Sequence, residues 1–128
     1  MRKVLVIGSN GLVGKGVSDF FENTKNVQLT KIDMDENFDL RDKQSVQKYL
    51  KSKSDIEYIV NCSGVNDHVD ENDSLDSTKT DLDNIDLFFD INVKSVCRII
   101  EYSKENLNNL KGVVNFASLY GIRSPYHP

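Results

Sequence analysis

One stretch near the start of the chain indicates the architecture, and it reads Lys3-Val4-Leu5-Val6-Ile7-Gly8-Ser9-Asn10-Gly11-Leu12-Val13-Gly14. Its first part is apolar and rich in β-branched residues, which is typical of a strand buried on both faces. After the glycines the apolar residues recur at helical spacing, which predicts an amphipathic helix over residues 12–22. The residues that carry this spacing are Val13, Val17, Phe20 and Phe21.

The glycine-rich turn between that strand and helix predicts a phosphate site. Glycine permits a tight turn and a close approach of the backbone to a diphosphate, and a helix N-terminus offers unpaired N–H groups. The spacing is G-x-x-G-x-x-G, not the G-x-G-x-x-G of the dehydrogenase fingerprint. The residues expected at the diphosphate are Gly8, Ser9, Asn10, Gly11, Leu12 and Gly14.

The rest of the chain continues the alternation of strands and helices. Strands are expected over residues 27–33, 56–62 and 113–117. A helix is expected after Asp42 as N-cap, and a long one over residues 83–107 whose apolar face includes Phe88, Asn92, Val96, Ile99 and Ile100. This order predicts an α/β domain, a doubly wound parallel sheet of about four to five strands with helices on both faces.

Asp33 closes the second expected strand. In dinucleotide folds an acid at this place bonds the adenosine ribose hydroxyls. The following residues Asp35 and Glu36 add negative charge and supply no arginine for a 2′-phosphate, so we expect NAD in preference to NADP. The alternative is a solvated acid at a strand end.

Composition bounds the remaining possibilities. The chain has 128 residues, a formal net charge of −4 and 38% hydrophobic residues, as expected for one soluble domain over residues 1–128. No apolar run is long enough for a membrane span, no signal peptide is expected, and mild acidity argues against nucleic acid. Cys62 and Cys97 are expected as buried free thiols of a cytoplasmic protein. His68 and His127 have no partners at metal-ligand spacing, so no metal site is expected.

With these motifs in order, the chain resembles the short-chain dehydrogenase/reductase family over essentially its whole length. Asp39-Leu40-Arg41-Asp42 resembles the family segment beside the adenine, and Asn61-Cys62-Ser63-Gly64 resembles the loop that lines the cofactor. Asn92 matches the helix asparagine that supports the active site through a backbone carbonyl and a water. Ser118 matches the catalytic serine that holds the substrate oxygen. The alternatives are that Asn92 only caps a bend or hydrogen-bonds a neighbouring backbone group, and that Ser118 is only a turn residue at the end of a strand.

The sequence departs from the family pattern in two places. Only five residues separate Asp33 from Asp39, where the usual fold inserts a helix and a strand. The chain resembles a subset of the family with that unit deleted, as in sugar-nucleotide reductases of the dehydrorhamnose type. After Ser118 the sequence has no Tyr-x-x-x-Lys, the family's proton-transfer pair, and Tyr126 cannot fill that role. We therefore expect a Rossmann-like dinucleotide-binding domain that lacks the family's C-terminal strands.

The resemblance implies the cofactor-binding part of an NAD-dependent oxidoreductase that moves hydride to or from a carbonyl or alcohol. A sugar or nucleotide sugar is the implied substrate, and His68 is a candidate contact to it. The intact enzyme is a possible homo-oligomer, and the chain itself is expected to be inactive. Two alternatives stay open: a stand-alone nucleotide-sensing module that binds NAD(H) without catalysis, and a degenerate interaction protein that binds nothing.

Overall fold

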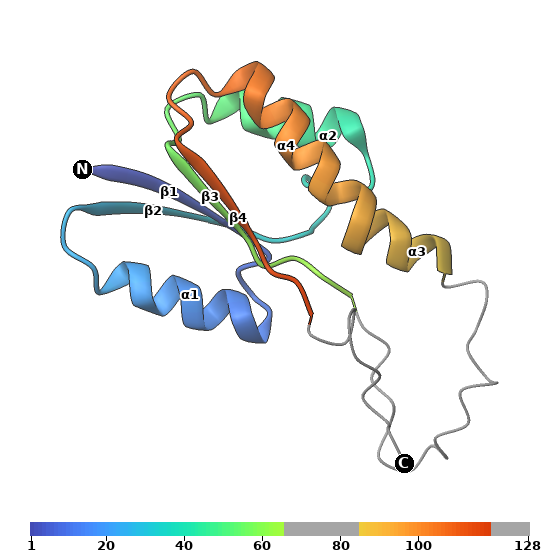
Figure 1. Cartoon of the computed structure of the whole chain (residues 1–128), viewed down its shortest axis with the longest axis horizontal. Coiled ribbons are helices and arrows are strands. Elements are labelled where there is room, and N and C mark those ends of the chain that lie inside the picture. Colours follow the sequence, from blue (N-terminus) through green and yellow to red (C-terminus); the bar gives the residue numbers. More distant parts are fainter. Residues whose placement is uncertain (66–84, 119–128) are drawn as a thin grey trace, which may run out of the picture.

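A computed structural model describes residues 1–65 and 85–118, and its centre is a four-stranded parallel sheet (Figure 1). The strands are β1 (Arg2–Ile7), β2 (Val27–Ile32), β3 (Tyr58–Asn61) and β4 (Gly112–Asn115). Their order in the sheet is β2-β1-β3-β4, and every neighbouring pair is parallel. The predicted α/β class, the parallel sheet and the strand positions are confirmed.

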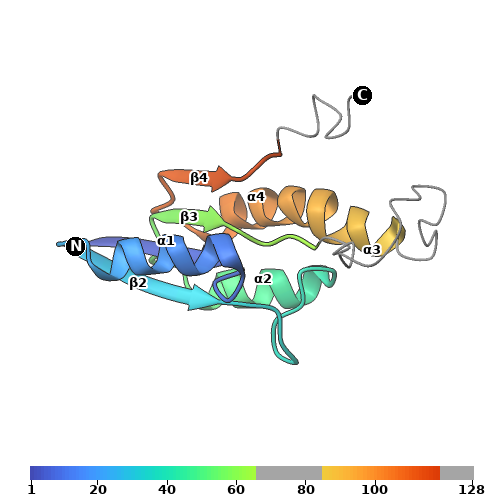
Figure 2. The same ribbon diagram turned by 90° about the horizontal axis from the view of Figure 1, so that it is seen from below.

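Helices cover both faces of this sheet. Helix α1 (Leu12–Glu22) lies on one face, whereas α2 (Lys43–Ser52) and α4 (Ser95–Asn106) pack side by side on the other, as Figures 1 and 2 show. Helix α4 continues α3 (Ile85–Phe89) through a π-helical segment, η3 (Asp90–Lys94). In the described residues, no helix combines the length and the apolar character that crossing a membrane requires.

The core consists of two apolar layers, one on each side of the sheet. Leu5, Ile7 and Ile59 point toward α2 and α4, while Val4, Val6 and Val60 point toward α1. Alternate strand residues face opposite sides, so the continuous apolar run of β1 supplies both layers. The second layer is thinner, and at its far edge Val114 and Phe116 are 53% and 57% exposed.

The buried face of α1 differs from the predicted one. Gly14 and Ser18 are buried, and Val17 packs against the sheet, whereas Val13 and Phe20 are 46% and 66% exposed. The reason is the close packing of Gly14 on the turn after β1, which rotates the helix so that its small residues face the sheet.

The long predicted helix over 83–107 begins at Ile85 in the described residues, and its apolar face is also different. Because the π-helical segment adds a residue to one turn, the helix rotates there. Ile91, Ser95 and Ile99 are buried, whereas Asn92 and Ile100 are exposed, so the predicted face is wrong in part.

The cysteines are free, as expected, but they are not both buried. Cys97 is exposed on α4, and Cys62 is half-buried at the end of β3. The apolar neighbours of Cys97 in the sequence misled the prediction, because Val96 and Ile100 themselves lie away from the fully buried side of the helix.

Glu57 holds the amino end of the sheet together. Its carboxylate accepts the Lys3 backbone N–H at 3.0 Å and pairs with the Lys111 ammonium, while its own N–H donates to the Lys3 carbonyl. It therefore links β1, β3 and the residue that precedes β4. The Lys111 ammonium and the Lys3 N–H hold the pKa of the Glu57 carboxyl below its usual value of 4.5.

We predict that Glu57→Gln lowers the melting temperature at pH 7 and that this difference shrinks in acid. A carboxyl whose folded pKa is lowered stabilises the fold above its unfolded pKa, and that stability is lost as the pH falls through the folded value. Thermal unfolding between pH 7 and pH 3 measures the effect. Glu105→Gln, which changes an exposed side chain of α4, is the control, and a constant difference at all pH values would contradict the prediction.

Candidate functional site

The candidate site lies at the carboxyl end of the sheet, between β1 and β3. The chain leaves β1 toward β2 on one side, whereas β3 and β4 lie on the other side. In open parallel sheets this reversal of strand order leaves a crevice beyond the strand ends. The glycine loop, Asp33 and the segments after β3 and β4 all meet at this edge.

The glycine loop packs so tightly that two of its glycines have no room for a side chain. Gly8 has a φ of 77°, and a Cβ placed on it would lie 2.6 Å from the Ser63 nitrogen. A Cβ on Gly14 would lie 1.9 Å from the Gly8 carbonyl oxygen. Gly11 differs, because a Cβ there would lie 3.7 Å from the nearest atom, which is ordinary contact.

The N-terminus of α1 opens toward the crevice without a side-chain cap. Gly11 is the N-cap, and the first turn contains no acidic residue. Unpaired N–H groups and the positive end of the helix dipole therefore remain available to an anion. The phosphate site that the glycine spacing predicts at this turn stays a prediction.

Asp33 is held by the backbone of the glycine loop. Its carboxylate accepts the Asn10 N–H at 2.7 Å and the Met34 N–H at 2.8 Å. Together with Ser9 and Asn10, it lines a cavity of about 490 Å³ that extends along the free edge of β2 to Tyr49 and Lys53. The carboxylate is thus fixed in direction beside the expected diphosphate site.

The family resemblance places the Asp39–Arg41 segment, called the wall below, beside the adenine, and only part of this segment is accessible. Leu40 is completely buried in the core, so its side chain supports the wall from behind. The Arg41 guanidinium bonds both carboxylate oxygens of Asp39, with the closest approach at 2.8 Å, and holds the pKa of that carboxyl below its usual range.

The segment after β3 is organised by amide side chains. Asn61 is 3% exposed; it donates to the Asn115 Oδ1 at 3.0 Å and accepts the Ser63 N–H at 3.1 Å. The ends of β3 and β4 are thereby joined. Burial raises the pKa of the Cys62 thiol, which packs against the core layer beside α1.

Asn92 connects the π-helical segment to the same loop. Its Oδ1 accepts the Val65 N–H and its Nδ2 donates to the Val65 carbonyl, both at 2.9 Å, and Gly64 lies against it. The side chain thus fixes the backbone after β3. The family role of its own carbonyl, with a water, stays a prediction.

Ser118 follows β4 at this edge and is exposed. The sequence candidates His68 and His127, and also Tyr126, lie outside the described residues.

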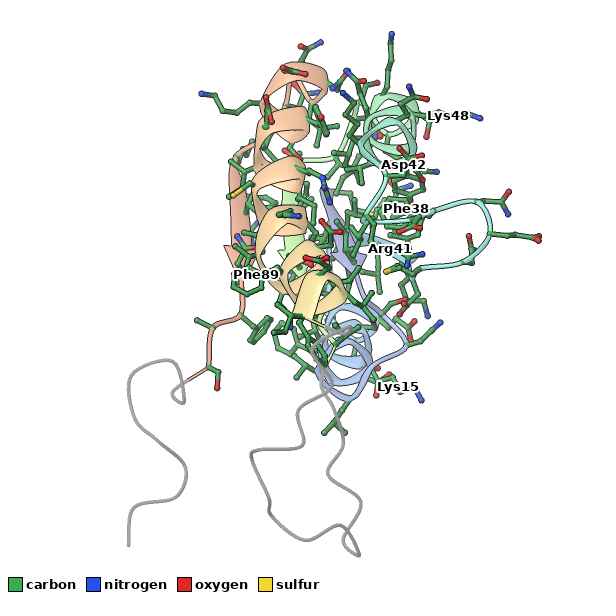
Figure 3. The ribbon with its side chains drawn as sticks, turned by 90° about the vertical axis from the view of Figure 1, so that its right-hand side faces the viewer. Lys15, Phe38, Arg41, Asp42, Lys48 and Phe89 are labelled. Carbon is green, nitrogen blue, oxygen red and sulfur yellow. The ribbon has the colours of Figure 1, made fainter. Side chains whose placement is uncertain are left out.

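A Tyr-x-x-x-Lys spacing that the sequence motifs did not include lies beside Asp33. Tyr49 and Lys53 form the single Tyr-x-x-x-Lys in the chain, and both line the cavity beside Asp33. They lie on and just after α2, and the ring of Tyr49 packs at a tilt against Phe38, which Figure 3 labels, with ring centres 4.9 Å apart. Burial raises the pKa of Tyr49. Both residues belong to the cavity wall beside Asp33, the residue expected at the adenosine ribose.

Known protein families show which family the chain belongs to. The family model of the NAD dependent epimerase/dehydratase family matches residues 4–127. The chain belongs to this family. No curated protein sequence matches it. Membership and the parallel sheet identify the chain as a cofactor-binding domain of an NAD-dependent family, with a Rossmann-like fold.

Solved structures agree on the fold. A small-chain dehydrogenase superposes with a TM-score of 0.78 at 10% identity, with 96% of this chain and 56% of that one covered. A short chain dehydrogenase family protein from Francisella tularensis gives 0.71 at 24%, covering 98% and 55%. The dTDP-4-dehydrorhamnose reductase of Bacillus anthracis gives 0.60 at 18%, covering 88% and 35%. The epimerase/dehydratase chain thus spans about half, or less, of the length of these proteins.

We predict that alanine at three glycines separates folding from binding in the epimerase/dehydratase chain. Gly14→Ala destabilises the fold by about 1–3 kcal/mol, because its Cβ meets backbone that cannot move aside. Gly11→Ala folds normally but weakens NADH binding about tenfold, because the added methyl separates the backbone from a diphosphate.

Gly16→Ala is the control for both variants. Its Cβ meets nothing within 4 Å and it lies inside α1, so alanine there stabilises the helix by about 0.5–1 kcal/mol. Chemical denaturation and NADH titration measure the two effects. Equal stability of the Gly14 and Gly16 variants would refute the packing argument.

Proposed function

We propose that this chain is the cofactor-binding part of an NAD(H)-preferring oxidoreductase. The intact enzyme would transfer hydride between the nicotinamide and a carbonyl or alcohol carbon, with a sugar or nucleotide sugar as substrate. The observation that carries the cofactor preference is the Asp33 carboxylate, which two backbone N–H groups hold beside the glycine loop.

The charges around Asp33 favour a ribose hydroxyl over a 2′-phosphate. Asp35 and Glu36 follow it in the exposed turn after β2. Two lysines line the same cavity, but each has another contact: Lys31 pairs with Glu22 at 2.6 Å, and the Lys53 ammonium lies 5.9 Å from the centre of the Tyr49 ring. A 2′-phosphate would therefore meet a fixed carboxylate before it met an available cation.

NAD also fits the rest of the crevice. The loop residues Gly8, Gly11 and Gly14 and the start of α1 would hold the diphosphate, and the Asn61–Gly64 segment would line the nicotinamide side. When bound, the cofactor supplies the hydride-transferring ring. The chain's own contribution is to bind and orient it, with Ser118 holding the substrate oxygen and Asn92 fixing the backbone behind it.

Two solved structures of similar fold hold the phosphorylated cofactor: a small-chain dehydrogenase was solved with NADPH and the dehydrorhamnose reductase with NADP. The test of the preference is therefore a comparison of NADH with NADPH. We predict that the chain binds NADH at least about tenfold more tightly than NADPH, and that Asp33→Asn weakens NADH binding by about tenfold, since charge-assisted hydrogen bonds are lost. Calorimetric titration measures both affinities. Glu36→Gln removes an exposed charge nearby and is expected to change NADH affinity less than twofold; tighter binding of NADPH by the unmodified chain would overturn the proposal.

We also predict that the 128-residue chain binds NADH weakly without turnover, because no Tyr-x-x-x-Lys follows Ser118 in its sequence. Loss of a general acid/base costs about 10²–10⁴-fold in rate. The measurement is NADH absorbance with sugar aldehydes and ketones. Oxidation of NADH above the background without protein would contradict this prediction.

The second candidate is a nucleotide-sensing module that binds NAD(H) without catalysis. Such a module requires the glycine loop and Asp33 but has no use for Ser118. A genomic reading frame that continues beyond Pro128 into Tyr-x-x-x-Lys would support the enzyme, and a stop codon after Pro128 would support the sensor.

A further inference from the structure

We infer that Arg98 is a positioning residue that fixes the Asp39–Arg41 wall of the crevice to helix α4. The inference rests on the proposed cofactor binding, because this wall would face the adenosine end of the cofactor. Neither the sequence motifs nor the family resemblance assigned a role to Arg98.

The guanidinium of Arg98 joins two parts of the chain that are distant in sequence. Its Nη1 donates to the Leu40 carbonyl at 3.0 Å, and its Nη2 donates to the Asp90 carboxylate at 3.4 Å. The side chain is 22% exposed, so solvent competes little for these bonds. A hydrogen bond from a charged donor in such surroundings is stronger than a neutral one.

Arg98 bonds the carbonyl of Leu40, the middle residue of the Asp39–Arg41 wall. On one side of Leu40, the Asp39 N–H donates to the Ser45 hydroxyl and the Asp39 carboxylate binds Arg41. On the other side, Asp42 caps α2 through the Gln44 N–H. These hydrogen bonds fix the local conformation of the segment. The bond from Arg98 to Leu40 fixes the position of the segment relative to α4.

The charges of the side chains around this bond also support the arrangement. Asp39, Arg41, Asp90 and Arg98 alternate in sign, and the guanidinium of Arg98 contributes, after that of Arg41, to the lowered pKa of Asp39. In Figure 3, Arg41 and Asp42 lie on the same side of α4 as α2 does.

The same helical stretch also controls the other end of the crevice. Asn92, in η3, binds the Val65 backbone through both amide atoms, and Asp90, the partner of Arg98, begins that segment. One continuous helix therefore holds the expected adenine wall through Arg98 and the expected nicotinamide loop through Asn92.

A matched pair of variants isolates the tie to Leu40. Lys94 also pairs with Asp90, at 3.0 Å, but of these two cations Arg98 is the one that bonds Leu40. Arg98→Gln and Lys94→Gln each remove one cation from Asp90, so their difference reports the bond to the wall. Titrations use ADP as a probe of the adenosine end and NMN as a probe of the nicotinamide end.

We expect Arg98→Gln to weaken ADP binding about five- to tenfold and NMN binding less than twofold, the size of one lost charge-assisted bond. Lys94→Gln should change both by less than twofold. Arg98→Lys keeps the charge and is expected to lose ADP affinity by about two- to threefold, which preserves the comparison if the glutamine variant folds poorly. Equal losses for ADP and NMN, or equal behaviour of the Arg98 and Lys94 variants, would overturn the inference.

Hydrogen exchange separates this inference from the proposed function. The backbone N–H groups of Asp39, Arg41 and Asp42 donate hydrogen bonds in the wall or next to it. Their exchange rates therefore report the order of the wall without any ligand. We expect about fivefold faster exchange in Arg98→Gln than in Lys94→Gln. If the unmodified chain binds neither ADP nor NADH, the proposed function fails, and this exchange difference alone decides the role of Arg98; unchanged exchange would overturn it.

Discussion

The contact between Gly8 and Gly14 is the constraint on which the rest of the site depends. The Gly8 carbonyl occupies the space that a Cβ on Gly14 would need, at 1.9 Å. Because neither residue has a side chain, the first turn of α1 lies directly against the end of β1. That position opens the helix N-terminus toward the crevice and brings the Asn10 N–H within 2.7 Å of Asp33. A methyl group at Gly14 would separate these parts, and one at Gly8 would meet the backbone of Ser63 after β3.

Around that contact, amide side chains determine the shape of the crevice. Asn61 links the ends of β3 and β4, and Asn92 fixes the backbone at Val65. Each amide offers both a donor and an acceptor, so it can replace a strand neighbour where the sheet ends. These amides fix the backbone that follows β3 and β4 at the edge of the crevice.

Sequence patterns were informative where structure depends on neighbours in the chain. The alternation of β1, the glycine turn and the acid at Asp33 are local signals, and the fold they predicted is confirmed. The exposed Phe20 and the break at η3 were not predictable in this way, because the rotation of each helix is set by packing and by one inserted residue. The bond from Arg98 to Leu40 spans 58 positions, and no local pattern signals it.

The two edges of the sheet differ in how they meet other chains. Strand β2 is an edge because the short segment after Asp33 adds no further strand, and it presents exposed Gln28 and Lys31. Such polar and charged side chains discourage an added strand from another molecule. Strand β4 presents Val114 instead, with Phe116 just beyond it, and both are more than half exposed. Among the residues that the structure describes, the β4 edge therefore favours the addition of a strand from another molecule more than the β2 edge does.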